Sequence, residues 1–101
     1  MEVGGFLLVL ITYDVNTETP TGRKRLRQVA KACKDYGQRV QNSVFECVVD
    51  TAQLLVVKNK LVKSIDAEKD SLRFYVIGNR KGQVEHYGIK PSFDITEPLV
   101  L

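Results

Sequence analysis

A single carboxylate, Asp14, stands just after the most apolar run in the sequence, which extends from Phe6 to Ile11. Six consecutive large apolar side chains are typical of a strand that is buried on both faces. Asp14 would then stand where the strand leaves the sheet, and open sheets often place their chemistry at strand ends. An aspartate is also common as a turn or cap residue, so the residue type alone leaves both interpretations open.

Basic residues are concentrated in the segment that follows. From Arg23 to Arg39 there are seven Lys or Arg residues and one acid, Asp35, so this segment carries net +6 whereas the whole chain carries +3. A charged helix face is usually only solvated, but like charges three or four positions apart repel, and cations near a helix N-terminus oppose the macrodipole. A nucleic-acid backbone would offset both penalties. The expected contact residues are Arg23, Lys24, Arg25, Arg27, Lys31 and Arg39.

The residues needed for several other chemistries are missing. His86 is the only histidine, which excludes a two-histidine zinc site, and the sequence places no histidine to activate Ser43. Cys33 and Cys47 lack metal-ligand spacing and are expected to be small buried apolar residues. There is no glycine-rich phosphate motif, and the segment 44–49 lacks the basic-Gly-aromatic motif with which RRM domains stack bases.

The elements that must position these residues form one domain, residues 1–101, because the chain is too short for two cores. Their order predicts the ferredoxin-like β-α-β-β-α-β arrangement, an α+β fold with an antiparallel four-stranded sheet. We expect strands at about 6–14, 39–41, 44–49 and 71–78, a short extended piece at 84–88, and helices at about 20–36 and 51–65.

Local signals mark the ends of both expected helices. Thr19 or Thr21 can cap the first helix, and Gly37 would end it as a C′ glycine. Asp50 or Thr51 can cap the second, with Gln53 placed to complete a capping box from Asp50. The apolar positions of the second helix predict that it packs on the core through Leu54, Val57, Leu61, Val62 and Ile65.

The apolar strands also predict a homodimer. Two helices can cover one face of the sheet, and large apolar patches are rarely left bare, so we expect a second copy related by a two-fold axis. The tail, residues 91–101, would add an edge strand to that neighbour, and residues 1–5 would form a loose extension. Two Asp14 carboxylates could then share one Mg²⁺, with Mn²⁺ as a substitute, and the ion would activate water for phosphodiester hydrolysis.

No segment of the sequence predicts a membrane partner. No run approaches the roughly 20 apolar residues of a membrane span. The N-terminus lacks the basic region and the cleavage pattern of a signal peptide. We therefore expect a cytoplasmic protein.

Several motifs, in this order and spacing, resemble the CRISPR-associated Cas2 family, and the resemblance covers about residues 8–101. The stretches from Asp14 to Pro20 and from Cys47 to Gln53 look closest to subtype I-C members. The motifs are Val-Leu-Ile-Thr-Tyr-Asp-Val from Val9, Gly-Arg-Lys-Arg-Leu-Arg from Gly22, Tyr36-Gly37, and Arg-Val-Gln-Asn-Ser-Val-Phe-Glu from Arg39.

The resemblance implies a Mg²⁺-dependent endonuclease that acts on RNA or double-stranded DNA. It implies a homodimer in which tail strands cross to the partner sheet, and a larger CRISPR integrase as partner in spacer acquisition. It assigns metal binding to Asp14, activity to Tyr13 beside it, and nucleic-acid contact to arginines that include Arg23, Arg25, Arg27 and Arg39. Ser43 and Phe45 would have supporting roles, although Phe45 also has a plain interpretation as core packing.

Two functions from different classes remain open. In the first, the dimer cuts nucleic acid with a metal ion at the paired Asp14 residues. In the second, it is a scaffold that presents duplex DNA to the integrase, and Asp14 is incidental. A third, a ferredoxin-like module that senses a small molecule, is disfavoured by the basic helix.

Overall fold

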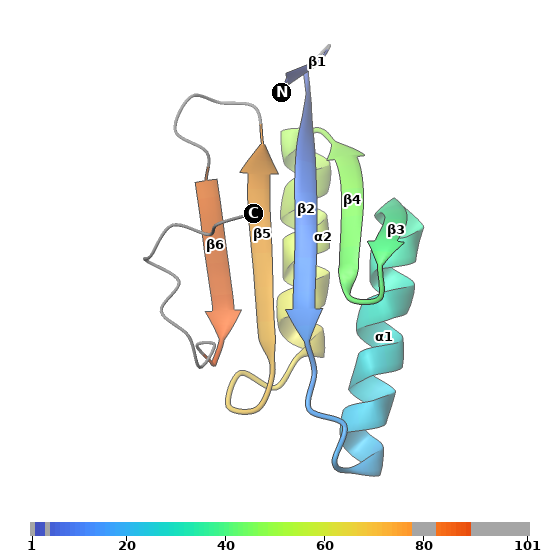
Figure 1. The fold of residues 1–101 in the computed structure, drawn as a ribbon. Helices are drawn as coiled ribbons and strands as arrows, with labels where there is room; N and C mark the ends of the chain where they lie inside the picture. Colours follow the sequence, from blue (N-terminus) through green and yellow to red (C-terminus); the bar gives the residue numbers. More distant parts are fainter. Residues whose placement is uncertain (1, 4, 78–82, 90–101) are drawn as a thin grey trace, which may run out of the picture.

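The computed structural model describes residues 2–3, 5–77 and 83–89, which form one sheet with two helices on one of its faces (Figure 1). The two helices lie on the same side because each one crosses over between two strands of a split β-α-β unit. In chain order the elements are β1 (Glu2–Val3), β2 (Phe6–Asp14), α1 (Pro20–Tyr36), β3 (Gly37–Gln41), β4 (Val44–Val49), α2 (Thr51–Ser64), β5 (Ser71–Ile77) and β6 (Gln83–Gly88).

The sheet has the strand order β3-β4-β2-β5-β6, and β1 pairs with β2. All the pairs are antiparallel. Strand β4 lies between β2 and β3, and β2 lies between β4 and β5, which is the strand order of a ferredoxin-like fold with β6 added at one edge. The predicted α+β fold and its antiparallel sheet are confirmed.

Both helices begin at the predicted caps. The Thr19 side chain accepts a hydrogen bond from the Gly22 amide at 3.0 Å, and Pro20 occupies the first turn, where its missing N–H has no cost. At α2, the Asp50 side chain accepts from the Gln53 amide at 2.7 Å while the Gln53 side chain accepts from the Asp50 amide at 2.9 Å. These reciprocal bonds are the capping box that the sequence predicted.

The hydrophobic core lies between the sheet and the two helices. Alternate residues of β2, β4 and β5 point toward the helices because side chains alternate between the two faces of a strand. The fully buried side chains include Ile11, Phe45, Leu61, Leu72 and Phe74. Cys33 and Cys47 are free thiols buried in this core, as expected.

Two details of the helices differ from the sequence-based expectation. Gly37 has an extended backbone (φ −159°, ψ −165°) and begins β3, so it is not a left-handed C′ residue. A glycine is needed there for another reason, since a Cβ would lie 2.4 Å from the Glu46 carbonyl oxygen and 2.5 Å from the Cys47 Sγ. Val62, expected in the apolar stripe of α2, is instead exposed.

The two ends of the chain were expected to be a loose extension and a crossing tail strand. Glu2 and Val3 pair with Leu7 and Phe6, so this part of the extension is a short strand, and it lies at the opposite end of β2 from Asp14 (Figure 1). The expected tail strand at 91–101 and the turn at 79–82 lie outside the described residues. No helix in the described part of the chain is long and apolar enough to cross a membrane.

Candidate metal and nucleic-acid site

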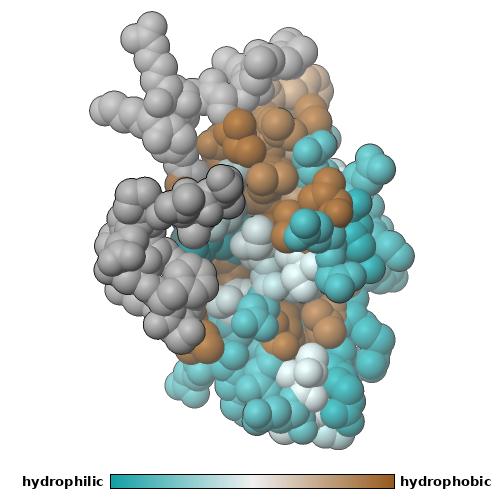
Figure 2. All heavy atoms as spheres, viewed as in Figure 1, coloured by the Kyte–Doolittle hydropathy of each residue, from teal (hydrophilic) through white to brown (hydrophobic). Residues whose placement is uncertain are grey.

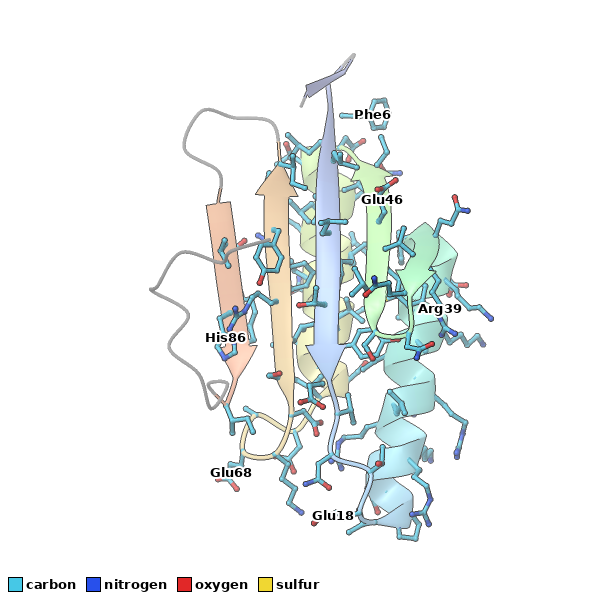
Figure 3. All side chains as sticks on the ribbon, viewed as in Figure 1. Phe6, Glu18, Arg39, Glu46, Glu68 and His86 are labelled. Carbon is cyan, nitrogen blue, oxygen red and sulfur yellow. The ribbon has the colours of Figure 1, made fainter. Side chains whose placement is uncertain are left out.

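The sheet face that the helices do not cover is called here the open face, and apolar side chains gather on its upper part in the view of Figure 2. The side chains on it come from alternate positions of β2, β4, β5 and β6, such as Leu8, Leu10 and Val48, which is 61% exposed. Polar groups interrupt this surface, and Glu46 and His86 can be followed in Figure 3. The open face is therefore suited to contact with another protein surface.

Asp14 is the last residue of β2 and lies on the open face, opposite Ser71 of β5. Its side chain is exposed and makes no hydrogen bond or ion pair with any residue that the structure describes. The described part of one chain also contains no group of three or more His, Cys, Asp or Glu side chains that could hold a metal ion. Within its described residues, one chain thus offers an exposed carboxylate at Asp14 but not a complete metal site.

Tyr13, expected to act beside Asp14, lies on the opposite face of the sheet. Its side chain is 5% exposed and stacks on Phe45 with ring centroids 6.1 Å apart. Its hydroxyl donates to the Asn42 carbonyl at 3.4 Å, and its amide donates to the Ser43 carbonyl at 3.1 Å. Burial raises the pKa of Tyr13 above its ordinary value. The described chain therefore brings Tyr13 to the turn between β3 and β4 and not to the Asp14 carboxylate.

The two residues assigned supporting roles lie close to Tyr13. Phe45 is fully buried in the core, and the guanidinium of Arg39 lies 5.2 Å from the centre of its ring, within the range of a cation–π contact. Ser43 forms the turn that precedes β4. This placement favours the plain interpretation of Phe45 as core packing and leaves the exposed Arg39 at the edge of the sheet.

Five cations form one surface on α1, called here the basic ridge. They are exposed, and after the adjacent first two the others follow at intervals of three and four residues, so all five lie on the same outer side of the helix. No acidic residue lies in the first turn of α1 to balance them. The basic ridge consists of Arg23, Lys24, Arg27, Lys31 and Lys34.

Arg25 does not belong to the basic ridge. It stands four residues before the buried Val29, which turns its side chain toward the body of the protein. Its Nε lies 2.8 Å from Oδ2 of Asp70 and its Nη2 lies 3.3 Å from Oδ1, a two-bond ion pair. The Arg25 side chain, which was expected to contact nucleic acid, is therefore already engaged in an ion pair within the fold.

Asp70 lies in the loop between α2 and β5 and was not singled out by the sequence analysis. It is fully buried and also accepts hydrogen bonds from the amides of Asn16 and Asp66, at 2.9 and 2.8 Å. Burial raises its pKa, but the Arg25 guanidinium and these amides outweigh burial and hold the pKa below its ordinary value. The one signal in the sequence that pointed to Asp70 was indirect. Arg25 falls on the inner side of the helix, where its positive charge requires a nearby anion.

The Asp70 contacts tie the loop after Asp14 to the rest of the domain. Asn16 is held by the Asp70 side chain, and the Asp70 carbonyl accepts from the Ile89 amide at 2.9 Å. Gly88 has φ +94°, and a Cβ on it would lie 2.0 Å from that carbonyl oxygen, so only glycine allows this approach. The segment that follows β2 is therefore tied through Asp70 to α1 and to the end of β6.

The fold and these surfaces define a small ferredoxin-like domain with a basic helix and a free carboxylate at a strand end. The sequence profile of the family described as CRISPR associated protein Cas2 matches residues 7–83. A relative from Halalkalibacterium halodurans, named CRISPR-associated endonuclease Cas2, is 62% identical over 93% of this chain and 99% of its own. The chain therefore belongs to the CRISPR-associated Cas2 family.

Other similar proteins agree with this assignment. A relative from Nitratidesulfovibrio vulgaris, named CRISPR-associated endoribonuclease Cas2, is 58% identical over 94% of each chain. The crystal structure of Streptococcus pyogenes Cas2 at pH 6.5 matches with a TM-score of 0.65 and 65% identity, over 70% of this chain and 86% of that one. The names of the two relatives describe nucleases, one without a stated substrate and one specific for RNA.

Proposed function

We propose that this protein is a metal-dependent endonuclease of the CRISPR system that hydrolyses phosphodiester bonds in double-stranded DNA or RNA. The observation that carries the proposal is the free Asp14 carboxylate, exposed on the open face at the end of β2. The names of relatives as endonuclease and endoribonuclease support the reaction class but differ on the substrate.

The metal in this proposal is Mg²⁺, for which Mn²⁺ can substitute. Both ions prefer oxygen ligands such as carboxylates, so the Asp14 side chain is suited to bind either of them. A single carboxylate per chain, however, would hold the ion only weakly. A homodimer formed through the open face would supply the second Asp14. When bound, the ion would lower the pKa of a water molecule and stabilise charge on the phosphodiester.

A homodimer is supported by the apolar character of the open face. Leu8, Leu10 and Val48 lie side by side there, because Leu8 is opposite Val48 in the register of β2 and β4. A symmetric contact would cover these side chains and place the same residues of both copies against each other. Asp14 stands on this same face, at its rim.

The basic ridge is proposed to bind the nucleic-acid backbone. Arg23, Lys24, Arg27 and Lys31 are exposed along one side of α1, where their charges can reach successive phosphates. Contacts of this kind carry charge and shape but no base sequence. This fits a protein that handles DNA or RNA without a fixed recognition sequence.

A second candidate function is a scaffold that holds duplex DNA for a larger CRISPR integrase during spacer acquisition. The specific observation in its favour is that the basic ridge is built entirely from α1 and does not involve Asp14. Binding of duplex DNA would then persist without any metal.

The substitution Asp14→Asn tests both candidates. As a nuclease, the variant should lose Mg²⁺-dependent cleavage by at least about 100-fold, the usual scale for removing a group that stabilises transition-state charge. Its duplex affinity, measured by fluorescence anisotropy in EDTA, should not fall. Asp35→Asn removes the same charge from an exposed site on α1 and should cut normally.

Spacer acquisition in cells separates the two functions. If Asp14→Asn abolishes cleavage but leaves acquisition unchanged, the protein acts as a scaffold in that process and the nuclease has another task. If Asp14→Asn cuts as well as the unsubstituted protein, the proposed role of Asp14 is wrong.

A further inference from the structure

Arg73 of β5 is a buried cation on the open face. Only 8% of its surface is exposed, and its neighbours Leu72 and Phe74 point to the core on the other side of the sheet. Its Nη1 donates to the Tyr75 hydroxyl at 3.2 Å, and its Nε and Nη2 lie 3.3 and 3.1 Å from Nδ1 of His86. Figure 3 shows His86 on β6, the strand that borders β5.

The partners of Arg73 among the described residues are all neutral. Arginine has no acceptor atom, so Nδ1 of His86 must be the acceptor and the imidazole proton must be on Nε2. Nε2 then donates to the Ile89 carbonyl at 2.8 Å, and the Gly88 carbonyl lies at 3.2 Å. In this arrangement the imidazole is uncharged, and it orients the guanidinium without balancing its charge.

No carboxylate pairs with Arg73 within the described residues. Arginine is rarely buried without a counter-charge, because taking an ion out of water is costly. Three contacts use three of its five N–H bonds, which leaves two donors for an acceptor outside the described residues. Within the described part of the chain, the guanidinium is thus held in one orientation with no counter-charge and with two N–H donors unused.

The register places Arg73 next to Asp14. Thr12 of β2 is opposite Arg73, and Asp14 is opposite Ser71, so Arg73 and Asp14 are diagonal neighbours on the open face. Diagonal neighbours in a sheet lie about 7–8 Å apart, which is within reach of a long side chain. That spacing leaves room for one phosphate group between the carboxylate and the guanidinium.

We propose that Arg73 is a phosphate-binding residue of the Asp14 site, which donates its two remaining N–H bonds to a non-bridging oxygen of the phosphodiester. The inference rests on the proposed nuclease function and names a group that the sequence analysis did not single out. A planar guanidinium presents its N–H bonds as a rigid fork toward phosphate oxygen, and its positive charge would balance the negative charge that hydrolysis builds on the phosphate. His86 and Tyr75 act as positioning residues for Arg73.

The first test measures phosphate binding without cleavage. ¹⁵N-labelled protein is titrated with dimethyl phosphate, a phosphodiester monoanion, in EDTA, and NaCl of equal ionic strength is the reference. The Nε–H signal of Arg73 should shift more with the phosphate than with chloride. Arg25, whose Nε is already bonded to Asp70, is an internal control and should shift little.

The second test uses phosphorothioate substrates, in which sulfur replaces one non-bridging oxygen at the cleaved bond. For the isomer that faces Arg73, cleavage should be several-fold slower in the unsubstituted protein, and Mn²⁺ should not restore it. In Arg73→Met, kcat should fall by about 100-fold, and the difference between the two isomers should disappear. Arg73→Lys, which keeps the charge but not the fork, should not restore the difference.

Arg27→Met, on the basic ridge, is the matched control. It should weaken duplex binding but keep the difference between the isomers. The inference is overturned if the Arg73 signal does not respond to dimethyl phosphate, or if Arg73→Met keeps the isomer difference. If Arg73→Met does not fold, the titration of the unsubstituted protein still decides. A protein that binds dimethyl phosphate at Arg73 but cuts no nucleic acid would contradict the proposed nuclease function and leave this phosphate site standing.

Discussion

At the level of single residues, Asp70 links three segments that are distant in the sequence. Its buried carboxylate bonds to Arg25 of α1, to Asn16 after β2 and to Asp66 before β5. Burying one charge is tolerated here because an opposite charge and two amides surround it. Through Asn16, this cluster determines where the chain leaves the Asp14 end of the strand.

The substitution Asp70→Asn should therefore be strongly destabilising. Removing one partner of a buried pair leaves the other charge unbalanced, at a cost of about 3 kcal/mol or more. Urea unfolding followed by circular dichroism measures the loss. Glu68→Gln, an exposed change in the same loop, should alter the free energy of unfolding by less than about 0.5 kcal/mol. Equal stability of the two variants would contradict the role given to Asp70.

Stability should also depend on pH through Asp70. Its pKa is held below the ordinary value in the folded protein, so its contribution is complete above the unfolded-state pKa of about 3.9. The contribution is lost as the pH falls below that value through the lower folded-state pKa. The difference in unfolding free energy between the unsubstituted protein and Asp70→Asn should thus shrink from pH 5 to pH 2. A constant difference over that range would argue against a charged Asp70.

The two thiols should be unreactive in the folded protein. Burial raises the pKa of Cys33 to about 12 and that of Cys47 to about 11, so almost no thiolate exists at neutral pH. With Ellman's reagent at pH 8, we expect modification only at the rate of unfolding, and full modification of both thiols in urea. Fast labelling of either thiol in native buffer would contradict their placement in the core.

At the level of elements, α1 presents two different basic surfaces. The inner surface consists of Arg25 alone, which forms an ion pair with Asp70 and stabilises the fold. The outer one is the basic ridge, whose five cations are set against a single acid on the helix, Asp35. The basic content of the helix therefore has two causes, and only the outer residues are available for a ligand.

Neutralising two residues of the basic ridge should reduce the salt dependence of duplex binding. The slope of log K against log [salt] is about −0.9 for each neutralised phosphate, so Arg27→Gln with Lys31→Gln should reduce its magnitude by about 2. Anisotropy titrations from 50 to 200 mM NaCl measure this slope. The control, Lys63→Gln with Lys69→Gln, makes the same charge change at exposed sites outside the ridge and should leave the slope nearly unchanged.

At the level of the whole molecule, the sheet has one covered and one open face. The helices protect the inner face, and the open face leaves Val48 and its apolar neighbours accessible. Asp14 and Arg73 lie on this same face, so dimerisation and the proposed chemistry would use a single surface. A change that prevents dimerisation should therefore also prevent metal-dependent cleavage.

Val48→Lys tests this coupling. A lysine among the apolar side chains of the open face should convert the proposed dimer to a monomer in sedimentation velocity, and Mg²⁺-dependent cleavage should disappear with it. Leu55→Lys is the control, because Leu55 is also exposed, at 57%, but lies on α2 away from the open face. Normal cleavage by a monomeric Val48→Lys protein would show that one chain is sufficient for activity.

Much of the local structure could be predicted from the sequence because the signals are local. The cap at Thr19, the capping box at Asp50 and Gln53, and the limits of β2 and β4 all depend on residues within a few positions of one another. The family could also be recognised from the order and spacing of its motifs, and the comparisons confirm it.

The sequence by itself therefore determined both helices and the strands from β2 onward, their order, and the position of Asp14 at a strand end. Only the tertiary structure decided which side chains from distant parts of the sequence contact one another. Arg25 and Asp70 are 45 positions apart, and their ion pair exists only after α1 packs beside the loop before β5. The contacts of Arg73 with His86, and its place beside Asp14, follow from the register of three antiparallel strands. Such contacts depend on long-range packing and pairing, whose register no local pattern specifies on its own.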